Sequence, residues 1–185
     1  DSDIAPINPE QTVAGTAYPA IGRRNRSVDY DAQAERFLQM LGDAPADSCL
    51  VLNANADNSA QVGELATRAL TAQGCRGVVT DGGTRDTQFI QEQEFPVYVR
   101  FQTPADSLCR WELLEWDTPV VIGDVEVSPG DIVFGDIDGV TVVPEDIAEE
   151  VLLEAETMRD DESSVREAVT NGVSPEVAYE RYGTF

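Results

Sequence analysis

Hydrophobic residues in the first hundred positions occur in two kinds of spacing. At residues 30–41 and again at 63–73 they recur every three or four positions, which predicts two amphipathic helices. At 48–53 and 77–80 they form short unbroken runs, which are typical of strands buried on both faces of a sheet. Three weaker elements complete the alternation: a strand at 11–18, a helix at 85–93 and a strand at 96–101. This order of strands and helices predicts an α/β core.

The pattern changes after Pro104. Short apolar segments separated by Gly and Pro-Gly turns predict strands at 113–122, 125–127, 131–134 and 140–143. Pro144 stands where a helix is expected to begin, and helical spacing then continues to residue 182 with an interruption near 171–175. Because no repeat and no linker divides the chain, we predict one layered α/β domain over residues 1–185.

Acidic residues dominate the charged positions. The 185 residues include 35 Asp and Glu against 12 basic residues, a formal net charge of −23. Such a field repels phosphate backbones, so nucleic-acid binding is not expected. The acidity, together with the lack of Lys, indicates either a solubility device or a halophilic protein adapted to high internal salt. No stretch approaches the roughly 20 apolar residues that cross a membrane, so no membrane partner is expected either.

Two missing residue types exclude whole mechanisms. The chain has no Lys, which excludes Schiff-base catalysis, and no His, which excludes a Ser-His-Asp triad and an imidazole base. Cys49, Cys75 and Cys109 are spaced too widely for a CxxC pair, and their odd number fits a reducing, cytoplasmic location. Cys49 and Cys75 lie in or beside apolar segments and are expected to be buried. An enzyme of this composition must use carboxylates, Arg, hydroxyls and backbone amides, with or without a metal.

Two motifs carry candidate chemistry. Gly63-Glu64-Leu65 opens the second predicted helix, where free backbone N–H groups favour an anion such as a carboxylate. The run DGGTRD, which ends in Arg85-Asp86, follows a buried strand at the edge of the sheet where ligands bind in α/β proteins. Arg85 offers a planar fork for a carboxylate or an oxyanion. Asp86 and Glu64 offer hard oxygens, which Mg²⁺ or Mn²⁺ takes directly or through water.

A purely structural interpretation stays open from the residues alone. An Arg-Asp pair after a Gly-Gly turn can be a helix N-terminus with a capping carboxylate and a surface ion pair. Glu64 near a helix start is favoured by the helix dipole without any function.

The order of motifs along most of the chain resembles one known family. Matching positions in the first half are Gly63-Glu64-Leu65, Ala69, Gly74, Gly77-Val78-Val79, Asp81-Gly82, Arg85-Asp86 and Phe95-Pro96-Val97. Those in the second half are Gly123-Asp124-Val125, Val127-Ser128-Pro129-Gly130-Asp131, Gly135-Asp136, Asp138-Gly139-Val140 and Val142-Val143-Pro144. In this order they resemble the RraA-like family, named after regulator of ribonuclease activity A. The resemblance is to its branch of 4-hydroxy-4-methyl-2-oxoglutarate / 4-carboxy-4-hydroxy-2-oxoadipate aldolases.

The resemblance implies a role for each candidate residue. The aldolase branch is marked by an acidic residue, twenty intervening positions and Arg-Asp, and Glu64 stands at that spacing from Arg85-Asp86. It implies that Asp86 binds the metal directly, that Arg85 binds the oxo acid, and that Glu64 holds a metal-bound water. Arg85 and Glu64 are then the catalytic pair. The substrate is bound by Gly63, Glu64, Leu65 and Arg85, with the backbone of 63–65 receiving the pyruvyl carboxylate.

The resemblance also implies an assembly. A further acid from the C-terminal helix of a neighbouring subunit completes the family's metal site through water, with Glu162 as the first candidate here and Glu156 as the second. A homo-oligomer, either a trimer or a hexamer, is therefore expected. The implied fold is a layered αββα sandwich of swivelling (phosphohistidine-domain-like) type with C-terminal helices. The resemblance also implies an N-terminal helix, which in the family precedes the point where this sequence begins.

The activity implied is that of a metal-dependent (class II type) lyase with Mg²⁺ or Mn²⁺ as cofactor. It would cleave 4-hydroxy-2-oxo acids by a retro-aldol reaction to pyruvate and a second oxo acid, with oxaloacetate decarboxylation as a companion activity. The alternative is a non-enzymatic RraA-like regulator that acts by protein–protein binding. That branch typically lacks the Asp of the Arg-Asp pair, so Asp86 favours the enzyme.

Overall fold

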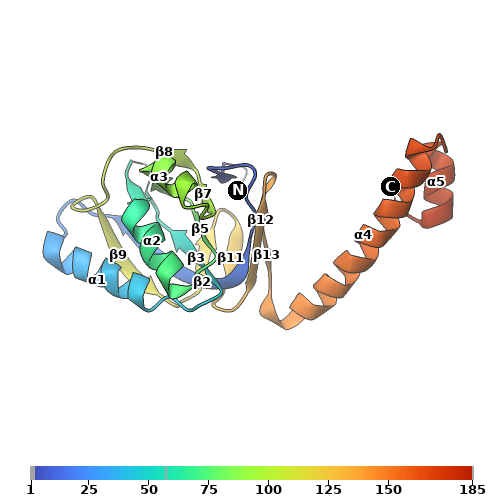
Figure 1. Ribbon diagram of the computed structural model, residues 1–185. Helices are drawn as coiled ribbons and strands as arrows, with labels where there is room; N and C mark the ends of the chain where they lie inside the picture. The colour runs from blue at the N-terminus through green and yellow to red at the C-terminus, as the bar shows by residue number, and fades with distance from the viewer. Residues whose placement is uncertain (1–2, 57, 185) are drawn as a thin grey trace. The chain divides into compact units, whose positions relative to one another are not determined.

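The computed structural model describes residues 3–56 and 58–184, and the chain divides by its contacts into two compact units, Asp1–Glu145 and Asp146–Phe185 (Figure 1). Each unit is described by itself. The prediction of a single domain over residues 1–185 stays a prediction. No helix in the described part of the chain is both long and apolar enough to cross a membrane.

An eight-stranded mixed sheet forms the centre of the first unit. Across the sheet the strands lie in the order β1 (Ala5–Pro6), β7 (Val97–Val99), β5 (Gly77–Thr80), β3 (Ser48–Asn53), β2 (Val13–Arg24), β12 (Ile132–Asp136) and β13 (Gly139–Val143), with β9 (Trp111–Trp116) also paired to β2. The pairs β2–β3, β3–β5 and β5–β7 are parallel, and the remaining pairs are antiparallel. The unbroken apolar runs at β3 and β5 thus occupy the parallel centre, as their composition predicts.

Alternating side chains of β3 divide the interior into two cores. Leu50 and Leu52 point to a core that includes Met40 of α1 (Tyr30–Gly42), Leu70 of α2 (Glu64–Gln73) and Ile90 of α3 (Thr87–Glu92). Cys49 and Val51 point to the opposite core, which the hairpin of β10 (Val120–Ile122) and β11 (Val125–Val127) helps to close. The sheet therefore lies between a layer of three helices and a small hairpin (Figure 1).

A second, three-stranded sheet positions the candidate residues. It consists of β4 (Ala60–Val62), β6 (Gly83–Thr84) and β8 (Phe101–Gln102), all parallel. The prediction of one strand at 96–101 is wrong, and the sequence pattern does not predict β4 or β6. Strands of two or three residues are too short to show a period, and the stretch 96–101 contains two strands that belong to different sheets.

Two further boundaries differ from the prediction. The helix expected at 85–93 begins only at Thr87, because Asp86 takes the left-handed conformation (φ 60°, ψ 30°) that cannot continue a helix. The segment expected as one strand at 113–122 is broken into β9 and β10. By contrast, α2 ends at Gly74, which is left-handed (φ 86°) as a C-terminal glycine stop predicts.

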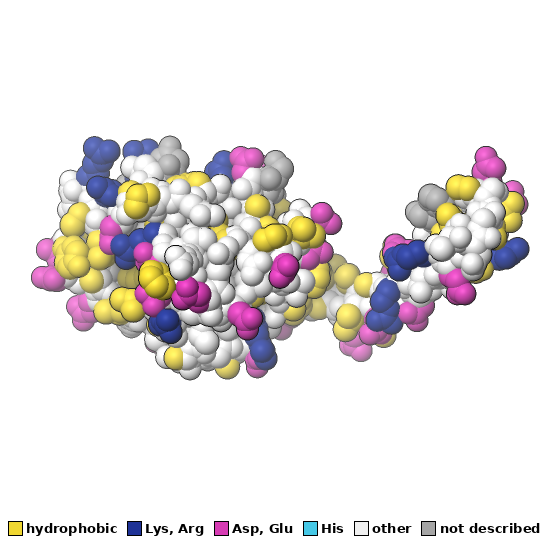
Figure 2. Space-filling view, turned by 45° about the horizontal axis from the view of Figure 1, so that its top comes forward, with side chains coloured by type: hydrophobic (Ala, Val, Ile, Leu, Met, Phe, Trp, Pro, Cys, Tyr) yellow, Lys and Arg dark blue, Asp and Glu magenta, His cyan; other side chains and the backbone are white. Residues whose placement is uncertain are grey.

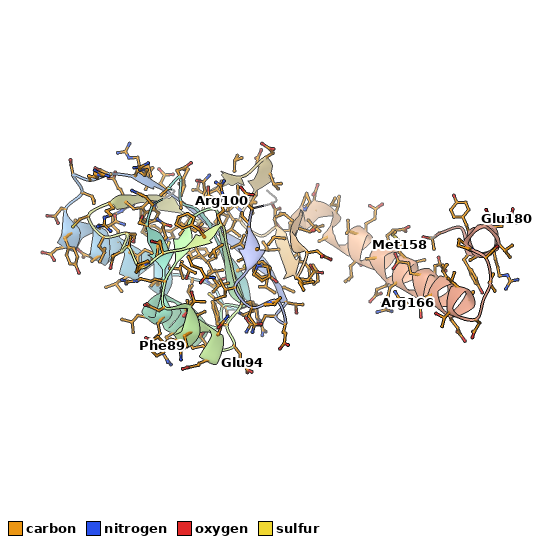
Figure 3. All side chains as sticks on the ribbon, turned by 90° about the horizontal axis from the view of Figure 1, so that it is seen from above. Phe89, Glu94, Arg100, Met158, Arg166 and Glu180 are labelled. Carbon is orange, nitrogen blue, oxygen red and sulfur yellow. The ribbon has the colours of Figure 1, made fainter. Side chains whose placement is uncertain are left out.

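The second unit consists of two helices, α4 (Ala148–Thr170) and α5 (Pro175–Tyr182), which pack against each other after a short 3₁₀ turn at Glu145–Ile147. The predicted interruption near 171–175 is confirmed: Ser174 caps α5 by accepting a hydrogen bond from Val177 N–H. Most of α4 is exposed, and Met158 and Arg166 project from it (Figure 3). Acidic side chains are scattered over the visible face of each unit (Figure 2).

A mixed α/β fold with C-terminal helices is therefore confirmed. The finer assignment to a swivelling αββα sandwich stays a prediction.

Candidate active site

The three strands of the small sheet end beside one another. Strand β4 ends at Val62, directly before Gly63-Glu64, and β6 ends directly before Arg85-Asp86. Beyond the strands the pairing continues, because Arg85 N–H donates to the Val62 carbonyl (3.1 Å) and Thr103 N–H to the Thr84 carbonyl (2.9 Å). Since parallel strands share one carboxyl edge, the two predicted motifs meet there.

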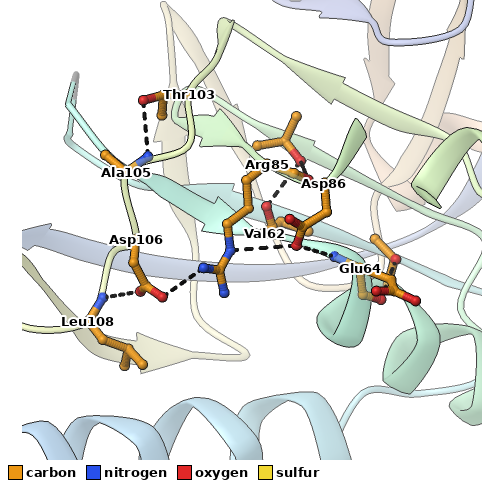
Figure 4. A network of polar contacts seen from close by, with 10 residues as sticks. Val62, Glu64, Arg85, Asp86, Thr103, Ala105, Asp106 and Leu108 are labelled. Carbon is orange, nitrogen blue, oxygen red and sulfur yellow. Dashed lines mark hydrogen bonds and ion pairs between the residues drawn. The ribbon is translucent and has the colours of Figure 1, made fainter. Parts of the chain in front are cut away.

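The carboxylate of Asp86 bonds a helix other than the one that it precedes. Asp86 stands at the N-cap position of α3, yet its side chain makes no capping bond to that helix. Its Oδ2 instead accepts a hydrogen bond from the backbone N–H of Glu64 at 3.2 Å (Figure 4). Asp86 therefore caps the first residue of α2 and not its own helix, and the structural interpretation stays open beside the functional one.

This bond also corrects the expectation that every N–H at the start of α2 is free for a ligand. The N–H of Glu64 is already used by Asp86. An α-helix cannot satisfy the N–H groups of its first turn internally, so those of Leu65 and Ala66 remain available to an anion.

Gly63 allows the two motifs to approach. Its backbone is extended (φ −146°, ψ −173°), a conformation that any residue can adopt. Glycine is therefore needed here because there is no space for a side chain, and not for its backbone freedom. A Cβ added there would lie 2.7 Å from Asp86 Oδ2 and 3.0 Å from Arg85 Nε. A side chain at this position would therefore collide with both candidate residues.

Arg85 lies between two carboxylates (Figure 4). Its Nη1 donates to Asp106 Oδ2 at 2.8 Å, and its Nε lies 3.7 Å from Asp86 Oδ2. The Arg85 side chain remains 39% exposed, so a solute can reach it. Asp106 was missed by the sequence reasoning; the available signal was an acidic residue in the loop that follows an apolar strand.

Glu64 has a weak partner. Its Oε1 accepts a hydrogen bond from Arg68 Nε at 2.8 Å, one helical turn further along α2. Such exposed pairs stabilise a helix by only about 0.3–0.5 kcal/mol. The Glu64 carboxylate can therefore leave Arg68 for a ligand at little cost.

These residues line one cleft with a volume of about 430 Å³, which is within the usual range for small-molecule sites. One end of the cleft is polar and contains Glu64, Arg85, Asp86 and Asp106. The other end is an apolar wall contributed by α1 and α2, with Ala34, Phe37, Leu38, Leu41, Leu65, Ala66 and Ala69.

Comparison with known proteins supplies the family. The model of the family described as "RraA-like: Aldolase/RraA" matches residues 1–142. The chain belongs to the RraA-like family. It is similar to the "Putative 4-hydroxy-4-methyl-2-oxoglutarate aldolase" of Halalkalibacterium halodurans, at 30% identity over 179 residues, covering 96% of this chain and 81% of that protein.

Two solved structures are similar to this RraA-like chain. One, from a study of "novel cellulases from microbes associated with the gut ecosystem", has 34% identity and a TM-score of 0.83, covering 88% of this chain and 73% of its own. The other is RraAS2 of Streptomyces coelicolor, described as "an unusual member of the RNase ES inhibitor RraA protein family". It has 25% identity and a TM-score of 0.79, covering 89% of this chain and 82% of its own.

The donor atoms of the RraA-like cleft suit a hard cation that keeps most of its waters. Among residues 3–56 and 58–184 no three acidic or thiol side chains cluster as a metal cage. However, Mg²⁺ usually binds through one or two carboxylates and several waters. The Asp86 side chain is 41% exposed, and no described residue donates to its Oδ1. The residues present therefore fit such an ion.

The C-terminal candidates belong to the second unit. Glu162 and Glu156 both lie on α4, and both are exposed. Because each unit is described by itself, their place in a shared site stays a prediction.

Asp81, the first residue of the DGGTRD run, has a structural role in this chain. Its Oδ1 accepts a hydrogen bond from the N–H of Ala54, which joins the ends of β3 and β5. Burial raises the pKa of the Asp81 carboxyl, and the bond to Ala54 opposes that rise. The expected burial of Cys49 and Cys75 is confirmed, and it raises the pKa of both thiols.

Proposed function

We propose that this RraA-like protein is a divalent-metal-dependent lyase that cleaves 4-hydroxy-2-oxo acids to pyruvate and a second oxo acid. The observation that carries the proposal is the Asp86 carboxylate, which turns away from its own helix and lies with Arg85 at the start of α2. Its Oδ2 satisfies the first N–H of α2, while its Oδ1, which no described residue bonds, would face the metal.

The metal would be held directly by Asp86, and through water by Glu64 of the same chain. A neighbouring copy would contribute one more acid through water, with Glu162 as the first candidate and Glu156 as the second. A bound Mg²⁺ or Mn²⁺ would polarise the 2-oxo group and lower the pKa of water. The swivelling αββα layering and the trimer or hexamer that brings Glu162 to the cleft are parts of this proposal.

The chain's own residues have distinct tasks. The N–H groups at the start of α2, around Gly63 to Leu65, receive the substrate carboxylate. Glu64 accepts the proton of the 4-hydroxyl, through water, as C4 becomes a carbonyl. When the C3–C4 bond breaks, its electron pair passes to the enolate of pyruvate, and Arg85 stabilises that negative charge. Protonation of C3 then releases pyruvate.

Oxaloacetate would give the same enolate by loss of carbon dioxide, so its decarboxylation is expected at the same residues. The apolar wall beside Leu38 and Leu65 lies next to the polar end of the cleft. It is where the substituent on C4 would lie.

The test is a screen for pyruvate release from a panel of 4-hydroxy-2-oxo acids and oxaloacetate, with Mg²⁺ or Mn²⁺ added, at low and at high salt. We expect release from at least one compound and its loss when the metal is chelated. No metal-dependent pyruvate release from any compound at either salt level would contradict the proposal.

The similarity to RraAS2 supports a second candidate, a regulator that binds a protein partner. Only the lyase requires the Asp86 carboxylate, as its metal ligand. A regulator without catalysis would release no pyruvate, and its binding of a partner would not depend on a divalent metal.

A further inference from the structure

A third carboxylate, that of Asp106, lies at the polar end of the cleft and takes no part in the proposed reaction. We infer that Asp106 is a positioning residue, which orients the guanidinium of Arg85 for the oxo acid. The inference rests on the proposed function, because it assigns Asp106 a task in the same site.

Asp106 is itself fixed by the loop after β8. Its Oδ1 accepts a hydrogen bond from Leu108 N–H at 2.7 Å, and its backbone carbonyl accepts one from Arg110 Nη1 at 3.2 Å. Its backbone also pairs with Ala60 of β4, whose N–H donates to the Ala105 carbonyl at 2.8 Å. The carboxylate is therefore attached to the same small sheet that delivers Glu64 and Arg85.

This attachment determines how Arg85 is presented. Nη1 lies 2.8 Å from Asp106 Oδ2, a charge-assisted hydrogen bond, whereas the 3.7 Å between Nε and Asp86 is too long for one. Asp106 is thus the stronger of the two constraints. The Nη2 group of Arg85 has no acceptor among the described residues. It can therefore donate to a substrate oxygen.

The competing interpretation is an ordinary exposed ion pair. The same unit offers a matched example in Arg76 and Asp47, which form a short pair on the surface, away from the cleft. Removal of either kind of pair has little effect on stability. Only a positioning residue would change the kinetics, and only while Arg85 is present.

The kinetic experiment compares Asp106→Ala, Asp106→Asn and the control Asp47→Asn. We expect Asp106→Ala to lower kcat/KM for pyruvate release by roughly 10- to 100-fold, through kcat as well as KM, because the displaced Arg85 both binds the oxo acid and stabilises the enolate charge. Asp106→Asn keeps one acceptor oxygen for two donors, Leu108 N–H and Arg85 Nη1, and should recover only part of the loss. Asp47→Asn should match the wild type, since asparagine tolerates the left-handed backbone at that position (φ 61°).

A double-mutant cycle tests whether Asp106 acts through Arg85. In an Arg85→Ala background, Asp106→Ala should change kcat/KM by less than about 2-fold, because coupled residues are not additive. Full additivity, or a wild-type kcat/KM in Asp106→Ala, would overturn the inference.

A second measurement does not depend on activity. Nitrogen-15 NMR of the arginine side chains should show slow rotation of the Arg85 guanidinium in the wild type and fast rotation in folded Asp106→Ala. Slow rotation in a wild type that releases no pyruvate would overturn the proposed function and leave the role of Asp106 in orienting Arg85 supported. Fast rotation in the wild type would overturn the positioning inference itself.

Discussion

Asp86 Oδ2 accepts a hydrogen bond from the backbone N–H of Glu64 at 3.2 Å, although 22 positions separate the two residues. The bond joins the start of α2 to the residue that precedes α3. It forms because β4 and β6 are parallel neighbours and because the left-handed backbone at Asp86 turns its carboxylate away from α3. A candidate metal ligand and a candidate carboxylate-binding helix start are thereby held in one place.

The first prediction concerns the space that this bond requires. Gly63→Ala should lower kcat/KM by roughly 10- to 100-fold while the fold is kept, because the added Cβ would displace Asp86 and Arg85. Kinetics and circular dichroism of the same sample check both parts. A variant with wild-type kinetics would show that the close contact is not needed.

Much of this arrangement can be predicted from the sequence. The unbroken apolar runs predict β3 and β5, and the helical spacing predicts α1 and α2. The resemblance to the RraA-like family, through its spacing of Glu64 from Arg85-Asp86, implies which residues meet. The three short strands of the second sheet could not be found, because two or three residues show no period.

Two features of the site could not be predicted: the place of Asp106 and the direction of the Asp86 carboxylate. Without β8 nothing indicates that the loop after it reaches Arg85, so Asp106 remained unnoticed. The direction of the Asp86 carboxylate depends on one left-handed residue, which no hydrophobic pattern reveals.

A second prediction concerns the support beneath Glu64. Leu70 lies on α2 and is fully buried in the core between helices and sheet. Leu70→Ala should lower the free energy of unfolding by about 2–5 kcal/mol, the usual cost of removing a buried leucine side chain. In the control, exposed Leu38→Ala should change it by less than about 0.5 kcal/mol. Equal effects in a denaturant titration would contradict the packing described for α2.

A third prediction concerns pH. Burial raises the pKa of Asp81 in the folded state above its value in the unfolded state. Between these two pKa values the folded protein binds more protons than the unfolded chain, so it loses stability as pH rises from the lower to the higher value. Asp81→Asn can keep the acceptor for Ala54 and removes the titration. The stability of the variant relative to the wild type should therefore increase as pH rises from about 3.8 upward and then become constant. A constant difference across this range in unfolding experiments would contradict the prediction.

A fourth prediction concerns salt. A net charge of −23 on 185 residues destabilises the folded chain by self-repulsion, which dissolved ions screen. The midpoint of thermal unfolding should rise as the concentration of a monovalent salt is increased. An unchanged or falling midpoint would indicate that the acidity contributes only solubility.

The central claim is that Asp86 is a metal ligand of a pyruvate-forming lyase, and substitution of this residue tests it most directly. Pyruvate release would be measured for the wild type, Asp86→Asn and the control Asp47→Asn across a titration with Mg²⁺ or Mn²⁺. We predict metal-dependent release in the wild type and in Asp47→Asn, and a loss of roughly 1,000-fold or more in folded Asp86→Asn, since metal catalysis supplies several kcal/mol. Metal-dependent release from Asp86→Asn at the wild-type rate would contradict the claim.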